Sequence, residues 1–76
     1  MDKKQLRKQI DAVDRRIVRD INERLEIVRL IGVEKKRLGL PVSNLTREAV
    51  VLSKTKTKFM KSIFKLIIQE SKRIQI

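Results

Sequence analysis

Seven polar side chains interrupt the apolar faces that this 76-residue chain would otherwise present as helices. They are Arg7, Arg24, Lys35, Arg47, Glu48, Ser71 and Gln75. A helix normally keeps charged groups away from its buried face, because an unpaired buried charge is costly. The pattern therefore predicts an anion-binding pocket inside a helical assembly.

The residue types present restrict the chemistry of such a pocket. The chain has no cysteine and no histidine, which excludes disulfides, thiol or imidazole nucleophiles and the usual zinc ligand sets. Catalysis would have to use Arg, Lys, Glu, Ser, Asn or Gln. We expect neither a metal nor a cofactor.

The net charge of +11 predicts an anionic partner, which could be nucleic acid, a membrane surface or a small polyanionic metabolite. The positive excess is spread over both halves of the chain, so charge alone does not choose among them. Phe59 and Phe64 are the only aromatic residues, too few for base stacking with single-stranded nucleic acid. The sequence has no continuous apolar run typical of a signal peptide or membrane span, so we expect a cytoplasmic protein.

Apolar residues at steps of three and four predict one long helix over residues 3–38. The stripe consists of Leu6, Ile10, Val13, Ile17, Ile21, Val28, Ile31 and Leu38. Arg24 and Lys35 occupy two places in this progression. Gly39-Leu40-Pro41 should end the helix, since glycine suits a left-handed cap and proline cannot continue the helix.

The length of this helix predicts a second chain. At 1.5 Å per residue it would be roughly 50 Å long, whereas a compact chain of this size has a radius of gyration of only ~11 Å. The remaining 38 residues cannot cover the whole stripe. We therefore expect an obligate homo-oligomer, with a symmetric dimer as the simplest form.

The second half of the chain predicts two shorter helices, over about 44–54 and 58–75. Ser43 or Asn44 can cap the first of them. The polar stretch 54–58 fits either a linker or a poorly buried helical turn. The expected fold class is all-α: one domain over 1–76, a three-helix protomer with a long N-terminal helix, intertwined as a homodimer.

The helical period predicts the directions in which the Lys and Arg side chains of the apolar stripe point. Arg24 and Lys35 are eleven residues apart, so they face nearly the same direction about 16 Å apart along the axis. Arg7 points about 100° away from Arg24, so it is poorly placed for the same pocket in its own chain but could enter the pocket of a partner packed alongside. Each position also has a plainer interpretation, because single Lys or Arg side chains in apolar stripes often extend their charged heads to water. Arg47 with Glu48, and Ser71 with Gln75, could equally be solvated helix ends.

Taken together, the motifs resemble a known family. In chain order they are RKQIDAVD at residues 7–14, NER at 22–24, GVEK at 32–35, PV at 41–42, TRE at 46–48 and FKLIIQES at 64–71, followed by Gln75. Their order and spacing resemble the all-helical class of chorismate mutases over nearly the whole chain. The resemblance implies an enzyme of phenylalanine and tyrosine biosynthesis that converts chorismate to prephenate in an intertwined dimer.

The resemblance also implies roles for the polar residues. Arg7 from the partner chain and Arg24 would bind substrate carboxylate. Lys35 and Gln75 would approach the ether oxygen of the bond that breaks, and Glu48 would accept a hydrogen bond from the substrate hydroxyl. The reaction is a unimolecular Claisen rearrangement, so it requires no nucleophile, metal or cofactor.

Further residues of the site follow by position, with three departures from the family pattern. By the resemblance, Arg47 and Ser71 would complete the polar wall. Ile31 and Ile68 would form apolar surfaces around the ring. Asn44 stands where the family commonly has an acidic residue, so its contact near the hydroxyl would be neutral. Lys72 replaces a usually apolar residue beside the pocket, where it would extend outward or add positive charge. The region 52–61 is roughly ten residues shorter than is common, which would abbreviate the turn between the two shorter helices.

Two other functions remain open at this point. Similar helical dimers act as isochorismate pyruvate lyases, for which Glu48 and Asn44 are the residues to examine. A basic helical dimer that binds nucleic acid through its phosphates would explain the +11 charge. It would not explain Arg24 and Lys35 within the apolar stripe, so we expect neither a nucleic-acid nor a membrane partner.

Overall fold

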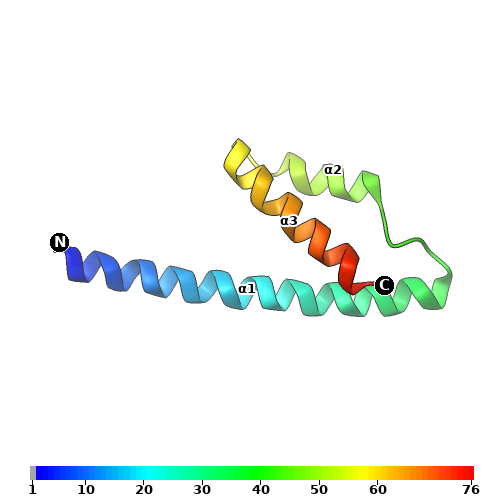
Figure 1. Ribbon diagram of the computed structural model, residues 1–76, viewed down its shortest axis with the longest axis horizontal. Coiled ribbons are helices and arrows are strands. Elements are labelled where there is room, and N and C mark those ends of the chain that lie inside the picture. Colours follow the sequence, from blue (N-terminus) through cyan, green and yellow to red (C-terminus); the bar gives the residue numbers. More distant parts are fainter. Residues whose placement is uncertain (1) are drawn as a thin grey trace.

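The protein consists of three helices joined by short segments (Figure 1). The computed structural model describes residues 2–76, with α1 over Lys3–Leu38, α2 over Leu45–Ser53 and α3 over Lys58–Ile74. The molecule is elongated, measuring 55 × 23 × 15 Å with a radius of gyration of 15.9 Å. The predicted all-α fold with a long first helix is confirmed.

Both ends of α1 have local capping signals. Asp2 accepts a hydrogen bond from the backbone N–H of Gln5, and the Gln5 side chain accepts one from the backbone of Asp2, which forms a capping box. At the other end Gly39 adopts a left-handed φ of 70°, a conformation that costs glycine little. The helix therefore stops where the Gly-Leu-Pro sequence predicts.

The starts of α2 and α3 are also capped by side chains. The Oδ1 atom of Asn44 accepts from the backbone N–H of Arg47 at 3.0 Å, so Asn44 is the cap and Ser43 is not. The stretch between α2 and α3 is a linker. Within it Thr55 is buried and donates to the carbonyl of Leu52 at 2.6 Å, while Thr57 caps α3.

The third helix packs against both others, whereas α1 and α2 do not approach each other closely within residues 2–76. In Figure 1, α3 crosses from the α2 side so that its C-terminal end meets the second half of α1. Val28 and Ile68 are the only buried apolar side chains among the described residues. Gly32 allows the close approach, because a Cβ there would lie 3.0 Å from Cα of Gln75.

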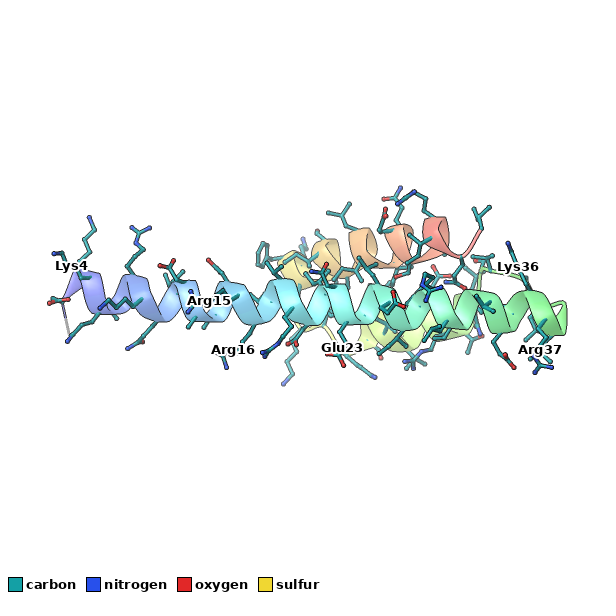
Figure 2. All side chains as sticks on the ribbon, turned by 90° about the horizontal axis from the view of Figure 1, so that it is seen from below. Lys4, Arg15, Arg16, Glu23, Lys36 and Arg37 are labelled. Carbon is teal, nitrogen blue, oxygen red and sulfur yellow. The ribbon has the colours of Figure 1, made fainter. Side chains whose placement is uncertain are left out.

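The first half of α1 extends beyond the other two helices (Figure 2). Its apolar stripe of Leu6, Ile10, Val13 and Ile17 is 42–57% exposed. The described chain thus leaves about half of the long helix without an apolar partner. No helix within residues 2–76 has the length and apolar content needed to cross a membrane.

Candidate functional site

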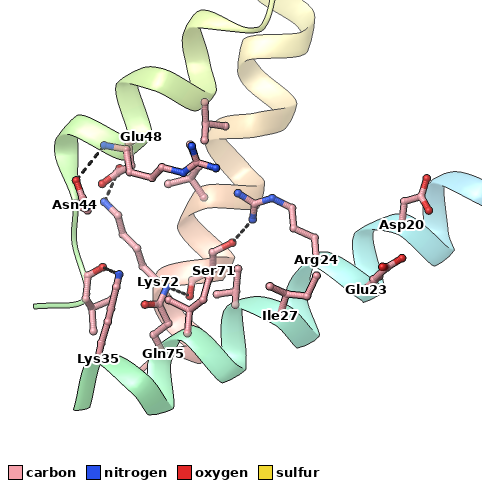
Figure 3. Close-up of a pocket in the computed structure, with 16 residues that line it drawn as sticks. Asp20, Glu23, Arg24, Ile27, Lys35, Asn44, Glu48, Ser71, Lys72 and Gln75 are labelled. Atoms are coloured by element: carbon pink, nitrogen blue, oxygen red, sulfur yellow. Dashed lines mark hydrogen bonds and ion pairs between the residues drawn. The ribbon is translucent and has the colours of Figure 1, made fainter. Parts of the chain in front are cut away.

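A cavity of about 530 Å³ lies between the second half of α1, the start of α2 and the end of α3 (Figure 3). Nine of the residues expected in the site line it. They are Arg24, Ile31, Lys35, Asn44, Arg47, Glu48, Ile68, Ser71 and Gln75. The three helices therefore bring together residues that are up to 51 positions apart in the sequence.

Arg24 is held at the cavity by Ser71. Its Nη1 donates to Ser71 Oγ at 2.7 Å, and the same hydroxyl donates to the carbonyl of Ile67 at 2.6 Å. Since the single hydroxyl hydrogen is committed to Ile67, the oxygen of Ser71 acts as an acceptor for the guanidinium. A guanidinium has five N–H donors, so several donors of Arg24 remain for a ligand.

Lys35 is half-buried and bonded within the protein. Its Nζ donates to the carbonyl of Val42 at 2.7 Å, which ties the end of α1 to the segment before α2. An ammonium group has three donors, of which this bond uses one. The side chain therefore lies in the cavity wall with donors still available, which argues against the plainer interpretation that it extends into water.

Gln75 follows the last residue of α3 and is 8% exposed. Its Nε2 donates to the carbonyl of Ser71 at 3.0 Å, while its Oε1 accepts no hydrogen bond from residues 2–76. One N–H of the amide is thus used, and a second remains. The close packing on Gly32 fixes this side chain, because the backbone and Cγ of Gln75 lie against the glycine.

Glu48 is paired across the cavity with Lys72, an ion pair between α2 and α3 that Figure 3 shows. Lys72 Nζ lies 2.8 Å from Glu48 Oε1, and Ser43 Oγ donates to Oε2 at 3.4 Å. The hydrogen bond and charge of Lys72 hold the pKa of the Glu48 carboxyl below its ordinary value, although partial burial acts in the opposite direction. At neutral pH Glu48 is therefore ionised and can only accept hydrogen bonds.

The start of α2 contributes two further polar groups. Asn44 uses its side-chain oxygen to cap the helix, which leaves its NH₂ group as a donor beside the cavity. Arg47 also lines the cavity, and its guanidinium donates to no other residue in the described part of the chain. Both groups could bind an anion without breaking an existing side-chain bond.

Arg7 is the one expected site residue that does not line this cavity. It is exposed on the first half of α1, seventeen residues before Arg24, or about 25 Å along the helix. Arg7 therefore cannot serve the cavity of its own chain. Its participation in a partner's cavity stays a prediction.

Several lining residues were not singled out as site residues from the sequence. They are Asp20, Glu23, Ile27, Val28, Val42 and Val51. Asp20 lies one turn before Arg24, and Val51 lies one turn after Arg47, so helical spacing from those arginines could have located both. Val42 provides a backbone carbonyl, for which the sequence has no side-chain signal. Lys72, noted only as a departure from the family pattern, also lines the cavity.

The fold and cavity define a class: a small all-α protein with a site of cationic and acidic side chains between one long helix and two short ones. The chain matches the family model of chorismate mutase type II over residues 6–76, and it belongs to this family. The resemblance seen in its motifs is confirmed.

Two curated proteins and one solved structure are similar to the chain. A 3-dehydroquinate dehydratase from Pyrobaculum aerophilum is 38% identical over 71 residues, which cover 93% of this chain and 23% of that protein. A bifunctional chorismate mutase/prephenate dehydratase from Aquifex aeolicus is 39% identical over 51 residues, covering 67% of this chain and 14% of that protein. The chain thus spans less than a quarter of the length of either curated relative.

The solved structure is that of a conserved hypothetical protein from Pyrococcus furiosus. It is 40% identical to this chain, with a TM-score of 0.87. The match covers 96% of this chain and 93% of the other. The three-helix arrangement is therefore shared over almost the full length of both chains.

Proposed function

We propose that this chain is a chorismate mutase that rearranges chorismate to prephenate. The observation that carries the proposal is that Arg24 from α1, Lys35 from α1, Glu48 from α2 and Gln75 at the end of α3 line one cavity. Membership in the chorismate mutase type II family supports the same substrate.

Arginine side chains would bind the two carboxylates of the substrate. A planar guanidinium can bind a carboxylate through two parallel hydrogen bonds, and Arg24 is already oriented by Ser71. Binding both carboxylates would hold the enolpyruvyl group over the ring in a reactive conformer. This restriction removes part of the entropic barrier before the reaction begins.

Lys35 and Gln75 would act on the ether oxygen. As the C–O bond breaks and the new C–C bond forms within the same molecule, negative charge increases on that oxygen. Lys35 has two unused N–H donors and Gln75 has one, and donors fixed by the protein stabilise such charge more in the transition state than in the ground state. Glu48, ionised beside them, would accept a hydrogen bond from the substrate hydroxyl.

The active form would be a homodimer with two shared sites. The exposed stripe on the first half of α1 supports this arrangement, because apolar surface of that extent is normally covered by a partner. The same half carries Arg7, which would complete the cavity of the other chain. Each site would then contain a guanidinium from both protomers.

The test is consumption of chorismate by the purified protein, with prephenate identified as the product. Lys35→Ala should lower kcat by on the order of 10²-fold or more, since it removes a donor to the developing charge. Lys36→Ala is the matched control, because Lys36 is exposed, adjacent in sequence and outside the cavity. It should leave turnover unchanged.

The alternatives predict different results. Release of pyruvate from isochorismate without turnover of chorismate would replace the mutase with a lyase. If a folded dimer acts on neither compound but binds DNA with an affinity that falls steeply with salt, the chain is a nucleic-acid-binding protein.

A further inference from the structure

Lys72 and Glu48 form an ion pair unlike the other ion pairs of the protein. Of the five pairs in residues 2–76, it alone joins two helices, whereas the other four link residues one or three positions apart on α1 or α3. Its side chains are 36% and 21% exposed, against 42–72% for the other pairs. Both members also line the cavity.

Lys72 changes the net charge of the cavity wall that a ligand would contact. The cavity wall carries four Lys or Arg side chains and three Asp or Glu side chains, so it has a small positive excess. Without Lys72 these numbers would be equal. A carboxylate such as Glu48 in the wall repels an anionic ligand, and the ammonium 2.8 Å from it offsets this repulsion.

The pair also fixes the position of Glu48. Lys72 binds Oε1 and Ser43 approaches Oε2, yet a carboxylate has about four lone-pair sites, so Glu48 can still accept a bond from a ligand hydroxyl. Three other cations line the same cavity: Lys35 and Arg24 from α1 and Arg47 from α2. Of these, Lys35 is bonded to Val42 and Arg24 to Ser71, and neither is bonded to Glu48.

We propose that Lys72 is a positioning residue, which holds the Glu48 carboxylate in the cavity wall and offsets its charge so that a dicarboxylate substrate can bind beside it. The inference rests on the function proposed above, since it assigns Lys72 a part in binding the same substrate. Lys72 acts through Glu48 and does not itself contact the reacting bond.

The experiment compares kcat and KM for chorismate, as functions of pH, in the wild-type protein, Lys72→Met and Lys72→Arg. Lys72→Met should raise KM about fivefold with a smaller change in kcat, near the upper range for partly exposed ion pairs. It should also move the acidic limb of kcat/KM to higher pH, because Glu48 then protonates more easily. Lys72→Arg keeps the charge and should restore both properties.

Two further measurements separate this role from a merely structural one. Carbon-13 NMR of the Glu48 carboxyl, assigned by its loss in Glu48→Gln, should show a higher pKa in Lys72→Met than in the wild type. Arg73→Met is the matched control, because it removes one cation from the same helical turn and breaks an exposed pair with Glu70. It should leave both the acidic limb and the Glu48 titration unchanged.

Each outcome of these experiments either supports the proposed role of Lys72 or overturns it. An active wild-type protein with an unchanged acidic limb or an unchanged Glu48 titration in Lys72→Met overturns the inference alone. If Arg73→Met shifts the acidic limb or the Glu48 titration as much as Lys72→Met does, the inference is also overturned. The shift would then come from the loss of any nearby positive charge. A wild-type protein without chorismate turnover overturns the proposed function, and the role of Lys72 with it. If Lys72→Met also fails to add an effect in the Glu48→Gln background, the two residues act together, as proposed.

Discussion

The two halves of α1 have the same sequence pattern but different surroundings. In the second half α3 covers Val28, which is 8% exposed, and Gly32, which lies against Gln75, while Ile31 and Leu38 stay 44% and 53% exposed. In the first half Ile10 and Ile17 are 57% and 49% exposed, and no other helix lies over them (Figure 1). One chain therefore covers only part of α1, within the half that carries the cavity, and in the proposed dimer the partner would cover the first half.

The Lys and Arg side chains within the stripe also differ in their surroundings between the two halves of α1. Arg24 and Lys35 on the second half are hydrogen-bonded to Ser71 and Val42 of their own chain. Arg7 on the first half lies far from that cavity. The same helix thus builds the site with one end and, in the proposed dimer, donates a side chain to the partner's site with the other.

Charge placed on the exposed first half of α1 should have the largest effect. Ile10→Glu combined with Ile17→Glu should abolish the dimer, because each buried isoleucine would contribute about 1.5–3 kcal/mol to the interface. With so few buried apolar side chains, the monomer should also lose most of its helical structure. Sedimentation and far-UV circular dichroism measure the two effects.

The matched control for that variant is Lys8→Glu with Arg15→Glu, which adds acidic residues to the same half outside the stripe. This pair should stay dimeric and helical. A folded, helical monomer in Ile10→Glu/Ile17→Glu would contradict the view that the first half needs a partner.

The covered half is tested by Gly32→Ala. In an unobstructed helix this change stabilises by about 1 kcal/mol. Here the added Cβ would lie 3.0 Å from Cα and Cγ of Gln75, so we expect a loss of about 1–3 kcal/mol and reduced turnover. Urea unfolding gives the sign of the stability change, with Val33→Ala as the exposed neighbour for comparison. A gain in stability would mean that α3 does not pack on Gly32.

A smaller effect concerns pH. Neighbouring Arg or Lys side chains lower the pKa of Glu26, Glu34, Glu48 and Glu70 in the folded protein. A lowered folded pKa contributes stability above the ordinary pKa of about 4.3, and this contribution is lost as the pH falls through the folded values. The urea midpoint should therefore fall on acidification below about pH 4, and less so in about 1 M salt, which screens exposed charges. A midpoint that rises on acidification would contradict this.

Local signals in the sequence were sufficient for the fold. The spacing of apolar residues gave 3–38 for the first helix, and the structure has Lys3–Leu38 ended by Gly39. Capping is harder to assign, because Ser43 and Asn44 are equally suitable residues and only the backbone geometry selects Asn44. Likewise, the stretch 54–58 fits a linker or a helical turn by its sequence, and only the structure shows that α2 ends at Ser53 and α3 begins at Lys58.

The site was predictable to the extent that it follows helical spacing and the family pattern. Those signals brought out Arg24, Lys35 and Gln75, which line the same cavity. They did not reveal the pairing of Lys72 with Glu48, because this contact depends on how α3 lies against α2. The roles of these residues in binding and catalysis stay predictions.

In the proposed dimer each site is built from both protomers, and a heterodimer of two inactive variants tests this sharing. Arg7→Ala and Lys35→Ala would be co-expressed with different tags, and the mixed dimer isolated with both tags. One of its two cavities then has Lys35 together with Arg7 from the other chain, whereas the second has neither. We predict about half the wild-type turnover per dimer, far above either homodimer. Turnover no higher than that of the homodimers would contradict a shared site.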